Sequence, residues 1–323
     1  MTMKVVNGLD DPALRKAGRV VLSIGVYDGV HLGHARVIGA LVREAKRLKA
    51  TPAVLTFYPH PRKVLGGAAP ALLTTREHRL ALLGGLGVRL CVVLPFTRGV
   101  AAMDAEGFVR DCLLRAVDLA GIVVGPRFAF GRGASGTVGL LRRLGEARGF
   151  TVAVVDGFTL EGRGVSSTAI RRMVRRGELS EASRLLGRPY SLRGPVTRGK
   201  ALGGKLGVPT ANIALEWALL PPAGVYAARA AVGGKTHDGV LNIDTRGVVE
   251  VHLFDFSRDL YGKMMEVFVG ARIRAERRFA TDEALARQMQ RDIAIARQML
   301  HTGASVNGGF RARRGGAAPQ SLI

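Results

Sequence analysis

Short apolar runs alternate with segments of helical periodicity through the first half of the chain. The segment 37–48 places apolar residues every three or four positions and turns Arg43, Lys46 and Arg47 to the opposite side, as in an amphipathic helix. Strands that alternate with such helices are typical of a parallel sheet with crossover helices. The pattern predicts an α/β doubly wound domain that ends near Leu186. Its expected strands lie at residues 20–24, 53–57, 91–94, 122–124 and 152–155.

The second half changes, after Pro189, to shorter β runs that are separated by glycines. Short strands with turn signals indicate a small antiparallel β-barrel. A helix is expected from Thr281 to Leu300, because Thr281 can cap it and Ala284 and Leu285 begin its apolar face. The tail beyond it has no apolar pattern to bury, so we expect it to be disordered. The expected strands cover residues 224–229, 239–243, 248–256 and 264–269, and the expected domains cover residues 1–186, 187–302 and 303–323.

The length of 323 residues is enough for two domains with separate cores. No apolar run approaches the roughly 18 residues of a membrane span, and the start of the chain lacks the apolar stretch of a secretory signal. We therefore expect a cytoplasmic protein with no membrane partner. The two cysteines, Cys91 and Cys112, are too few for a disulfide framework or a thiolate metal site, and we expect both to be buried.

The net charge of +23 makes nucleic acid a candidate partner. The excess of Lys and Arg is spread along the chain and forms no basic stripe or aromatic-basic motif. A dispersed excess is more typical of an arginine-rich composition than of a dedicated nucleic-acid interface. Nucleic acid is therefore not expected as the main partner.

The sharpest motif is GVYDGVHLGH, from Gly25 to His34, at the point where the first expected strand gives way to a helix. Ligands of open α/β sheets bind at the carboxyl ends of strands, and the N–H groups of a helix N-terminus suit phosphate. Gly25 and Gly29 allow a tight turn, and His31 and His34 reach the same side of the opening helical turn. The alternatives are a metal-binding pair or incidental histidines, but the glycines and the position favour phosphate binding.

This motif resembles the adenylyltransferase domain of the bacterial bifunctional riboflavin kinase/FAD synthetases. Three further segments match that family in order: 57–61 (FYPHP), 124–131 (VGPRFAFG) with Gly136, and 165–171 (VSSTAIR). The resemblance implies a Rossmann-like nucleotidyltransferase domain that uses ATP, with His31, His34 and Arg171 as catalytic residues. Its implied ATP-binding residues are Gly25, Tyr27, Asp28, Gly29, His31, His34, Ser167, Thr168 and Arg171, and its implied flavin-binding residues are Pro59, His60, Arg127, Phe128 and Phe130.

Two features of the N-terminal match leave alternatives open. Arg171 lies one turn into a helix that begins at Ser166–Thr168, so its guanidinium and the helix N–H groups could converge on one anion. Taken alone, the same serines and threonine would be an ordinary helix cap. Arg127 also stands where the family usually carries Asp or Asn, which makes flavin adenylylation less secure than nucleotidyl transfer itself.

Residues 194–300 resemble the riboflavin kinase domain of the same family. The most specific segment is the Pro-Thr-Ala-Asn run at 209–212, which follows a glycine-rich stretch. Such a loop supplies backbone N–H groups for phosphate and oxygen ligands for Mg²⁺. Glu250 begins an expected strand, so its carboxylate could point into the barrel mouth and accept a proton from a primary alcohol, although alone it would read as a surface residue. The resemblance implies that Gly203, Lys205, Thr210 and Asn212 bind ATP, that Thr210 and Asn212 hold Mg²⁺, and that Glu250 is the catalytic base.

The C-terminal match has one clear departure from the family. Residues 242–247 run almost directly into Glu250, where the family carries a longer Pro-Thr-Phe loop. Because that loop is expected to form part of the flavin pocket, the kinase is expected to bind riboflavin weakly.

Three hypotheses about function follow. The first is phosphorylation of riboflavin to FMN and adenylylation of FMN to FAD, with ATP and flavin as substrates and Mg²⁺ as cofactor. The second is a nucleotidyltransferase paralogue that acts on a modified flavin or a related phosphate and has an impaired kinase. The third is a non-catalytic flavin- or nucleotide-binding regulator. The sequence gives no prediction of the oligomeric state.

Overall fold

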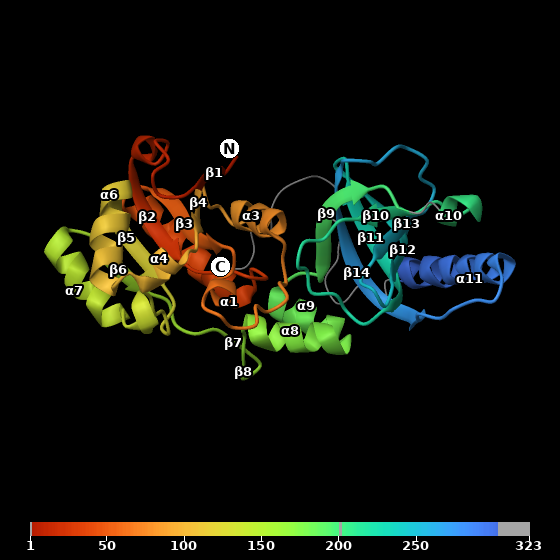
Figure 1. Ribbon diagram of the computed structural model, residues 1–323. Helices are drawn as coiled ribbons and strands as arrows, with labels where there is room; N and C mark the ends of the chain where they lie inside the picture. Colours follow the sequence, from red (N-terminus) through yellow and green to blue (C-terminus); the bar gives the residue numbers. More distant parts are fainter. Residues whose placement is uncertain (1, 200–201, 303–323) are drawn as a thin grey trace. The chain divides into compact units, whose positions relative to one another are not determined.

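The computed structural model describes residues 2–199 and 202–302 (Figure 1). Its contacts divide the chain into two compact units. Of the described residues, the first includes those up to Pro70 together with Arg79–Val165, and the second includes Ala71–His78 and those from Ser166 to Thr302. Residues 166–186 are therefore grouped with the second unit. The boundary predicted at residue 186 separates domains that would fold independently, which this grouping by contacts does not test, so it stays a prediction.

The first unit contains a six-stranded parallel sheet in the order β1-β4-β3-β2-β5-β6. This confirms the predicted α/β class and all five predicted strands. Sequence patterning missed β1, a four-residue edge strand that pairs only with β4 and has a single buried residue. The strands are β1 (Lys4–Asn7), β2 (Arg19–Ile24), β3 (Thr51–Tyr58), β4 (Leu90–Pro95), β5 (Asp118–Val124) and β6 (Thr151–Val154).

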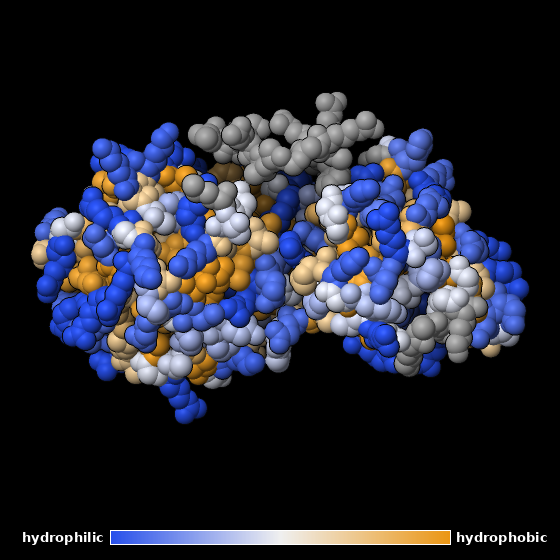
Figure 2. All heavy atoms as spheres, turned by 90° about the horizontal axis from the view of Figure 1, so that it is seen from above, coloured by the Kyte–Doolittle hydropathy of each residue, from blue (hydrophilic) through white to orange (hydrophobic). Residues whose placement is uncertain are grey.

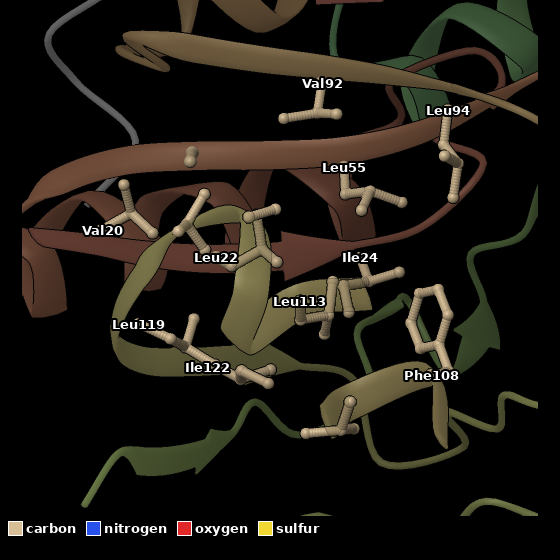
Figure 3. Close-up of a cluster of buried hydrophobic side chains, with 14 of the residues drawn as sticks. Val20, Leu22, Ile24, Leu55, Val92, Leu94, Phe108, Leu113, Leu119 and Ile122 are labelled. Atoms are coloured by element: carbon tan, nitrogen blue, oxygen red, sulfur yellow. The ribbon is translucent and has the colours of Figure 1, made fainter. Parts of the chain in front are cut away.

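Helices cover both faces of this sheet. Successive residues of β2 point to opposite faces, so Val21 packs with Ile38 and Leu41 of α1, whereas Leu22 belongs to the cluster that contains Leu141 of α7. Figure 3 shows part of the second cluster, with side chains from β2, β3, β4 and β5 converging on Phe108 and Leu113. The longer helices are α1 (Leu32–Arg47), α3 (Arg76–Gly85) and α7 (Val138–Arg148).

Shorter elements connect the strands of the first unit. The predicted helix at 37–48 is confirmed but begins earlier, at Leu32, because His31 caps it. The short elements are η1 (Arg15–Ala17), α2 (Pro61–Val64), α4 (Arg98–Ala102), α5 (Ala105–Gly107), η2 (Phe108–Leu113), α6 (Leu114–Ala116), η3 (Arg132–Ala134), β7 (Thr159–Leu160) and β8 (Arg163–Gly164).

The second unit contains the predicted barrel, closed in the order β10-β13-β12-β11-β14-β9. Patterning missed β9, which contains Gly194 and Pro195, and β10, which has only three residues. The strands are β9 (Ser191–Thr197), β10 (Ala211–Ile213), β11 (Gly224–Val232), β12 (Lys235–Ile243), β13 (Val249–Leu253) and β14 (Met264–Ala275), and the helices are α8 (Ser167–Arg176), α9 (Leu179–Leu186), α10 (Leu202–Lys205) and α11 (Asp282–His301).

The terminal helix α11 packs on the outside of the barrel wall. Alternation along the strands turns Leu241, Val251 and Val267 inward, where they are fully buried. Val225, Ala227 and Val240 face the other way and form an apolar cluster with Ala296 and Leu300 of α11. The predicted Thr281 cap is confirmed, since its Oγ1 accepts a hydrogen bond from the N–H of Ala284 at 3.2 Å.

A segment from the first half of the sequence belongs to the barrel unit. The Leu72 N–H donates to the Trp217 carbonyl at 2.9 Å, and the Leu219 N–H donates to the Leu72 carbonyl at 2.7 Å. The Thr75 hydroxyl donates to the Arg193 carbonyl, and His78 Nε2 lies 3.2 Å from a carboxylate oxygen of Glu266. Nothing in the hydrophobic pattern predicted this segment, which we call the strap (residues 71–78).

The remaining expectations concern cysteines, surface and tail. Both cysteines are free, but only Cys91 is buried, and Cys112 is half-buried. Figure 2 shows hydrophilic residues spread over the visible face rather than gathered in one stripe. No helix in residues 2–199 or 202–302 is long and apolar enough to cross a membrane. The predicted disordered tail, 303–323, lies outside the described residues.

Candidate active sites

The loop between β2 and α1 is held in an unusual backbone conformation. Tyr27, Gly29 and Val30 all have positive φ values, of 52°, 82° and 38°. Such values are uncommon for residues with a side chain, and least favourable for a β-branched residue such as Val30. The turn delivers His31 to the N-cap of α1, where its Nδ1 accepts a hydrogen bond from the His34 N–H at 3.2 Å.

His31 and His34 lie on the same side of the first turn of α1, as the motif predicted, and their rings stack, which it did not predict. Their ring centroids are 3.6 Å apart and the rings are inclined by only 14°. Because Nδ1 of His31 accepts a hydrogen bond, the neutral imidazole carries its proton on Nε2 and can donate from there. The absence of a side chain at Gly33 leaves room for the His31 ring, because a Cβ at that position would lie only 3.2 Å from it, which is closer than nine in ten real Cβ contacts.

The side chains of Tyr27 and Asp28 are buried under the loop between β2 and α1 and support its backbone. The Tyr27 hydroxyl lies 2.6 Å from the Ser23 Oγ, and burial raises the pKa of Tyr27 well above its usual range. Asp28 is only 2% exposed and its carboxylate lies 3.7 Å from the Arg79 guanidinium. A Cβ on Gly25 would collide with the Tyr27 ring. The predicted nucleotide contacts of these residues stay predictions, and the backbone is the part that can make them.

The predicted flavin-binding residues follow the carboxyl ends of β3 and β5, on the same sheet edge as the histidine loop. Pro59 and His60 come directly after β3, and His60 caps α2 by accepting a hydrogen bond from the Arg62 N–H. Arg127 is exposed after β5. Phe128 is half-buried and stacks on Phe130, which is itself 9% exposed and part of the sheet core. Of the two rings, Phe128 is therefore the more available to a ligand.

Ser167, Thr168 and Arg171 lie on α8, which belongs to the second unit, whereas the two histidines belong to the first. The cap of α8 is Ser166, whose Oγ accepts a hydrogen bond from the Ala169 N–H at 3.3 Å. Arg171 is buried, and its Nε donates to the Ala71 carbonyl of the strap at 3.0 Å. The predicted ATP contacts of these three residues stay predictions.

A second candidate site, the kinase cleft, is a cavity of about 510 Å³ on the outside of the barrel. It lies between the outer face of the barrel wall, the loop 203–210 and α11. It brings together the predicted residues Gly203, Thr210 and Glu250. Asn212 pairs with Glu250 across β10 and β13, but its amide packs against Gly199. The side chain of Lys205 lies outside the described part of the structure.

Glu250 does not point into the barrel mouth, as was expected, but lines the kinase cleft on the outer face. Strand β13 alternates, so Val249, Val251 and Leu253 are buried on the inner side while Glu250 and His252 face outward. The Glu250 side chain makes no hydrogen bond or ion pair with any residue in the described ranges, although the charge of Arg246 interacts with it. A half-buried carboxylate in a cleft that is not held by the protein in this way is suited to act on a ligand.

Sequence reasoning missed two residues that shape the kinase cleft. The His252 Nδ1 lies 2.8 Å from the Pro209 carbonyl, which ties the loop before Thr210 to β13. Asn242 faces Glu250 across β12 and β13. The sequence held a signal for Asn242: the short segment between it and Glu250 fits a β-hairpin, which would place the two residues on neighbouring strands.

The shortened β12–β13 hairpin is closed by hydrogen bonds. Partial burial opposes ionisation of Asp244, but hydrogen bonds from the Val248 N–H and from Arg246 outweigh it and lower the pKa of Asp244. The Thr245 N–H donates to the Glu276 carboxylate at 2.7 Å. The hairpin thus places Arg246 at the cleft.

Apolar residues from α11 form one wall of the kinase cleft. Leu285, Met289 and Ile293 are spaced four apart, so they lie on one helical face, and Val225 and Val240 also line the cleft. The helix is fixed nearby by Arg274, whose guanidinium lies 2.8 Å from the buried carboxylate of Asp292. The shortened hairpin has no Pro-Thr-Phe segment, so the apolar surface of the cleft comes from this wall. Weak riboflavin binding stays a prediction.

Comparison with known proteins gives consistent matches over most of the chain. The FAD synthetase family model matches residues 14–169 and the riboflavin kinase model matches residues 186–300. The bifunctional riboflavin kinase/FMN adenylyltransferases of Escherichia coli and Pseudomonas fluorescens are each 35% identical to it, over 309 and 305 residues, and each match covers 92% of this chain and 98% of the relative. A crystal structure described as a macrolide-efflux protein from Streptococcus pneumoniae has a TM-score of 0.76 at 26% identity, covering 92% of this chain and 99% of that one. The chain therefore belongs to the family of bacterial bifunctional riboflavin kinase/FMN adenylyltransferases.

Proposed function

We propose that this protein phosphorylates riboflavin to FMN in the barrel unit and adenylylates FMN to FAD at the histidine loop, with ATP as the donor in both reactions. The observation that carries this function is that the two matched family regions each contain a separate candidate site. The impaired-kinase paralogue and the non-catalytic regulator are not favoured, because curated relatives match along both regions together.

In the kinase cleft, Glu250 acts as the base. Its carboxylate accepts the proton of the primary hydroxyl of riboflavin while the hydroxyl oxygen bonds to the γ-phosphorus of ATP. The bond between that phosphorus and ADP breaks, so the products are FMN and ADP. The Glu250 side chain makes no hydrogen bond or ion pair with the described residues, which supports this role.

Mg²⁺ is the cofactor that we propose for this step, with Thr210 and Asn212 as its protein ligands. Thr210 lines the cleft, and hydroxyl and amide oxygens suit a hard cation. Residues 2–199 and 202–302 contain no group of three or more His, Cys, Asp or Glu that could hold a metal. An ion here would therefore take most of its ligands from phosphates and water. When bound, it would offset the negative charge of the transferring phosphate.

At the histidine loop, His31 and His34 bind the phosphates of ATP. An oxygen of the FMN phosphate bonds to the α-phosphorus of ATP, and the bond to pyrophosphate breaks, which gives FAD. Negative charge grows on the oxygens around the α-phosphorus, and two fixed imidazole donors stabilise it. We propose that the N-terminus of α8, with Ser167, Thr168 and Arg171, supplies further phosphate contacts. Flavin contacts are assigned to Pro59, His60, Arg127, Phe128 and Phe130.

The function is tested by incubating the purified protein with ATP, Mg²⁺ and either riboflavin or FMN, and by following FMN and FAD by chromatography. We expect both products from riboflavin and FAD from FMN. Formation of neither product would contradict the proposal. We place the reaction in the cytoplasm, with ATP and flavins as the partners and no main role for nucleic acid.

A further inference from the structure

Asn242 and Glu250 face each other on neighbouring strands of the barrel wall. They form a cross-strand pair between β12 and β13, and both line the kinase cleft. The side chains of such a pair lie on one face of a sheet, with Cβ atoms about 4.5–5.5 Å apart. A carboxamide and a carboxylate therefore stand next to each other in the cleft.

Neither of these side chains is held by a hydrogen bond or an ion pair to a described residue, although the charge of Arg246 interacts with the Glu250 carboxylate. Both side chains are half-buried. Polar groups that are removed from water are normally paired, with protein, water or ligand. The other neighbours in the same cross-strand row do not offer this, because Asn212 is assigned to Mg²⁺ in the proposed function and Val225 is apolar.

We propose that Asn242 binds the same primary hydroxyl that Glu250 deprotonates. This inference rests on the kinase function proposed above. The amide N–H₂ of Asn242 donates to the hydroxyl oxygen, which leaves the hydroxyl proton to the neighbouring carboxylate. As the proton passes to Glu250 and the oxygen bonds to phosphorus, the amide stabilises the negative charge on that oxygen. Asn242 thus selects a substrate that ends in an alcohol.

The test compares riboflavin with 5′-deoxyriboflavin, which lacks this hydroxyl and can only inhibit. In Asn242→Ala we expect kcat/KM for riboflavin to fall about 10-fold, the scale of one lost hydrogen bond to a charge-bearing group. The inhibition constant of 5′-deoxyriboflavin against FMN formation should stay within about 2-fold of wild type, because the analogue never uses the amide. A variant that merely disturbed the cleft would weaken both ligands together.

Asn242→Asp supplies a second readout. An aspartate at this position has no N–H to donate, and its negative charge repels the charge that grows on the hydroxyl oxygen, so kcat/KM for riboflavin should fall further than in Asn242→Ala. The matched control is Asp238→Ala, on the same strand and the same face but outside the kinase cleft, where Asp238 pairs with Arg229. We expect that control to leave kcat/KM for riboflavin and the affinity for the analogue unchanged.

The outcomes separate the inference from the function on which it rests. Wild-type protein that makes no FMN would overturn the kinase function itself. Active wild type together with an Asn242→Ala variant of unchanged kcat/KM would overturn only the role of Asn242. The same conclusion follows if 5′-deoxyriboflavin loses as much affinity as riboflavin, since the amide would then not act on the hydroxyl.

Discussion

The Nδ1 of His31 accepts a hydrogen bond from the backbone N–H of His34, and the two imidazole rings stack with centroids 3.6 Å apart. One side chain thus caps α1 and also fixes the position of the second. Positive φ values at Gly29 and Val30 hold the loop that brings His31 there. The pair is therefore set in place by the backbone before any ligand arrives, as a preorganised site for charge requires.

Replacing either histidine should abolish most adenylyl transfer. We expect His34→Ala to lower the rate of FAD formation from FMN by about 10²-fold or more, the scale of a lost preorganised donor. His31→Ala should do the same and also lose the helix cap, at about 1 kcal/mol of stability. His31→Asn is the matched control, because asparagine caps a helix but carries no imidazole. If His31→Asn forms FAD at the wild-type rate, the role assigned to His31 is only structural.

The strap makes the barrel depend on residues that precede it in the sequence. A fragment that contains only residues 187–302 loses the backbone bonds of Leu72, the partner of Glu266, and the Ser183 Oγ that accepts from the Tyr190 N–H. We expect this fragment to unfold at a lower temperature than the barrel in the full chain, measured by calorimetry. Adding residues 1–186 as a separate chain should restore part of the difference. Equal transition temperatures would show that the predicted boundary at 186 separates two independent domains.

Glu266 should make the stability of the protein depend on acid pH. Burial opposes its ionisation, but the nearby His78 imidazole, a hydrogen bond from Ser191 and the charge of Arg193 outweigh burial and lower its pKa to about 2, from 4.5. Burial lowers the pKa of His78, whose Nε2 lies 3.2 Å from the Glu266 carboxylate. A carboxyl group with a lowered pKa contributes stability above its unfolded pKa and loses that contribution as the pH falls toward its folded pKa.

The acid loss of stability should therefore fall between about pH 5 and pH 2. We expect the free energy of unfolding, measured in urea, to drop over that range in the wild type. Glu266→Gln should be less stable at neutral pH and should change less on acidification. Parallel pH curves for the two proteins would assign the effect to other carboxyl groups.

Local signals in the sequence were enough to predict the elements whose chemistry is local. The parallel sheet followed from alternating apolar runs, and the cap of α11 followed from Thr281 beside an apolar face. The placement of His31 and His34 on one side of the helical turn followed from their three-residue spacing at a strand-to-helix turn. Each of these depends on residues that are close in sequence.

The features that were missed depend on distant contacts. Strands β9 and β10 are short or contain Gly and Pro, and only closure of the barrel makes them strands. Glu250 was predicted to point into the barrel mouth, whereas the structure turns it outward. A strand pattern shows which residues alternate but not which side of the strand is the interior. The strap joins residues 71–78 to strands more than a hundred positions later, and no periodicity reports such a contact.

The apolar wall from α11 leads to the last prediction, which separates flavin binding from chemistry in the kinase cleft. Met289 lines the cleft together with Leu285 and Ile293, on the face of α11 that looks across the cleft to the barrel wall. Truncating it removes three side-chain atoms (Cγ, Sδ and Cε); if the isoalloxazine ring covers about two CH₂-sized groups of that surface, the loss is roughly 1.5 kcal/mol or about a tenfold change. We expect Met289→Ala to raise KM for riboflavin about 10-fold with little change in kcat.

Glu250→Gln is the contrasting variant, because it keeps the shape of the side chain and removes the base. Its kcat should fall by about 10²-fold or more while KM for riboflavin stays close to wild type. Steady-state FMN formation at saturating ATP measures both constants for both variants. If Met289→Ala lowered kcat and left KM unchanged, α11 would not be the flavin wall. In that case the Asp244–Gly247 hairpin, with Arg246 at the cleft, would become the part of the barrel that has to hold the ring.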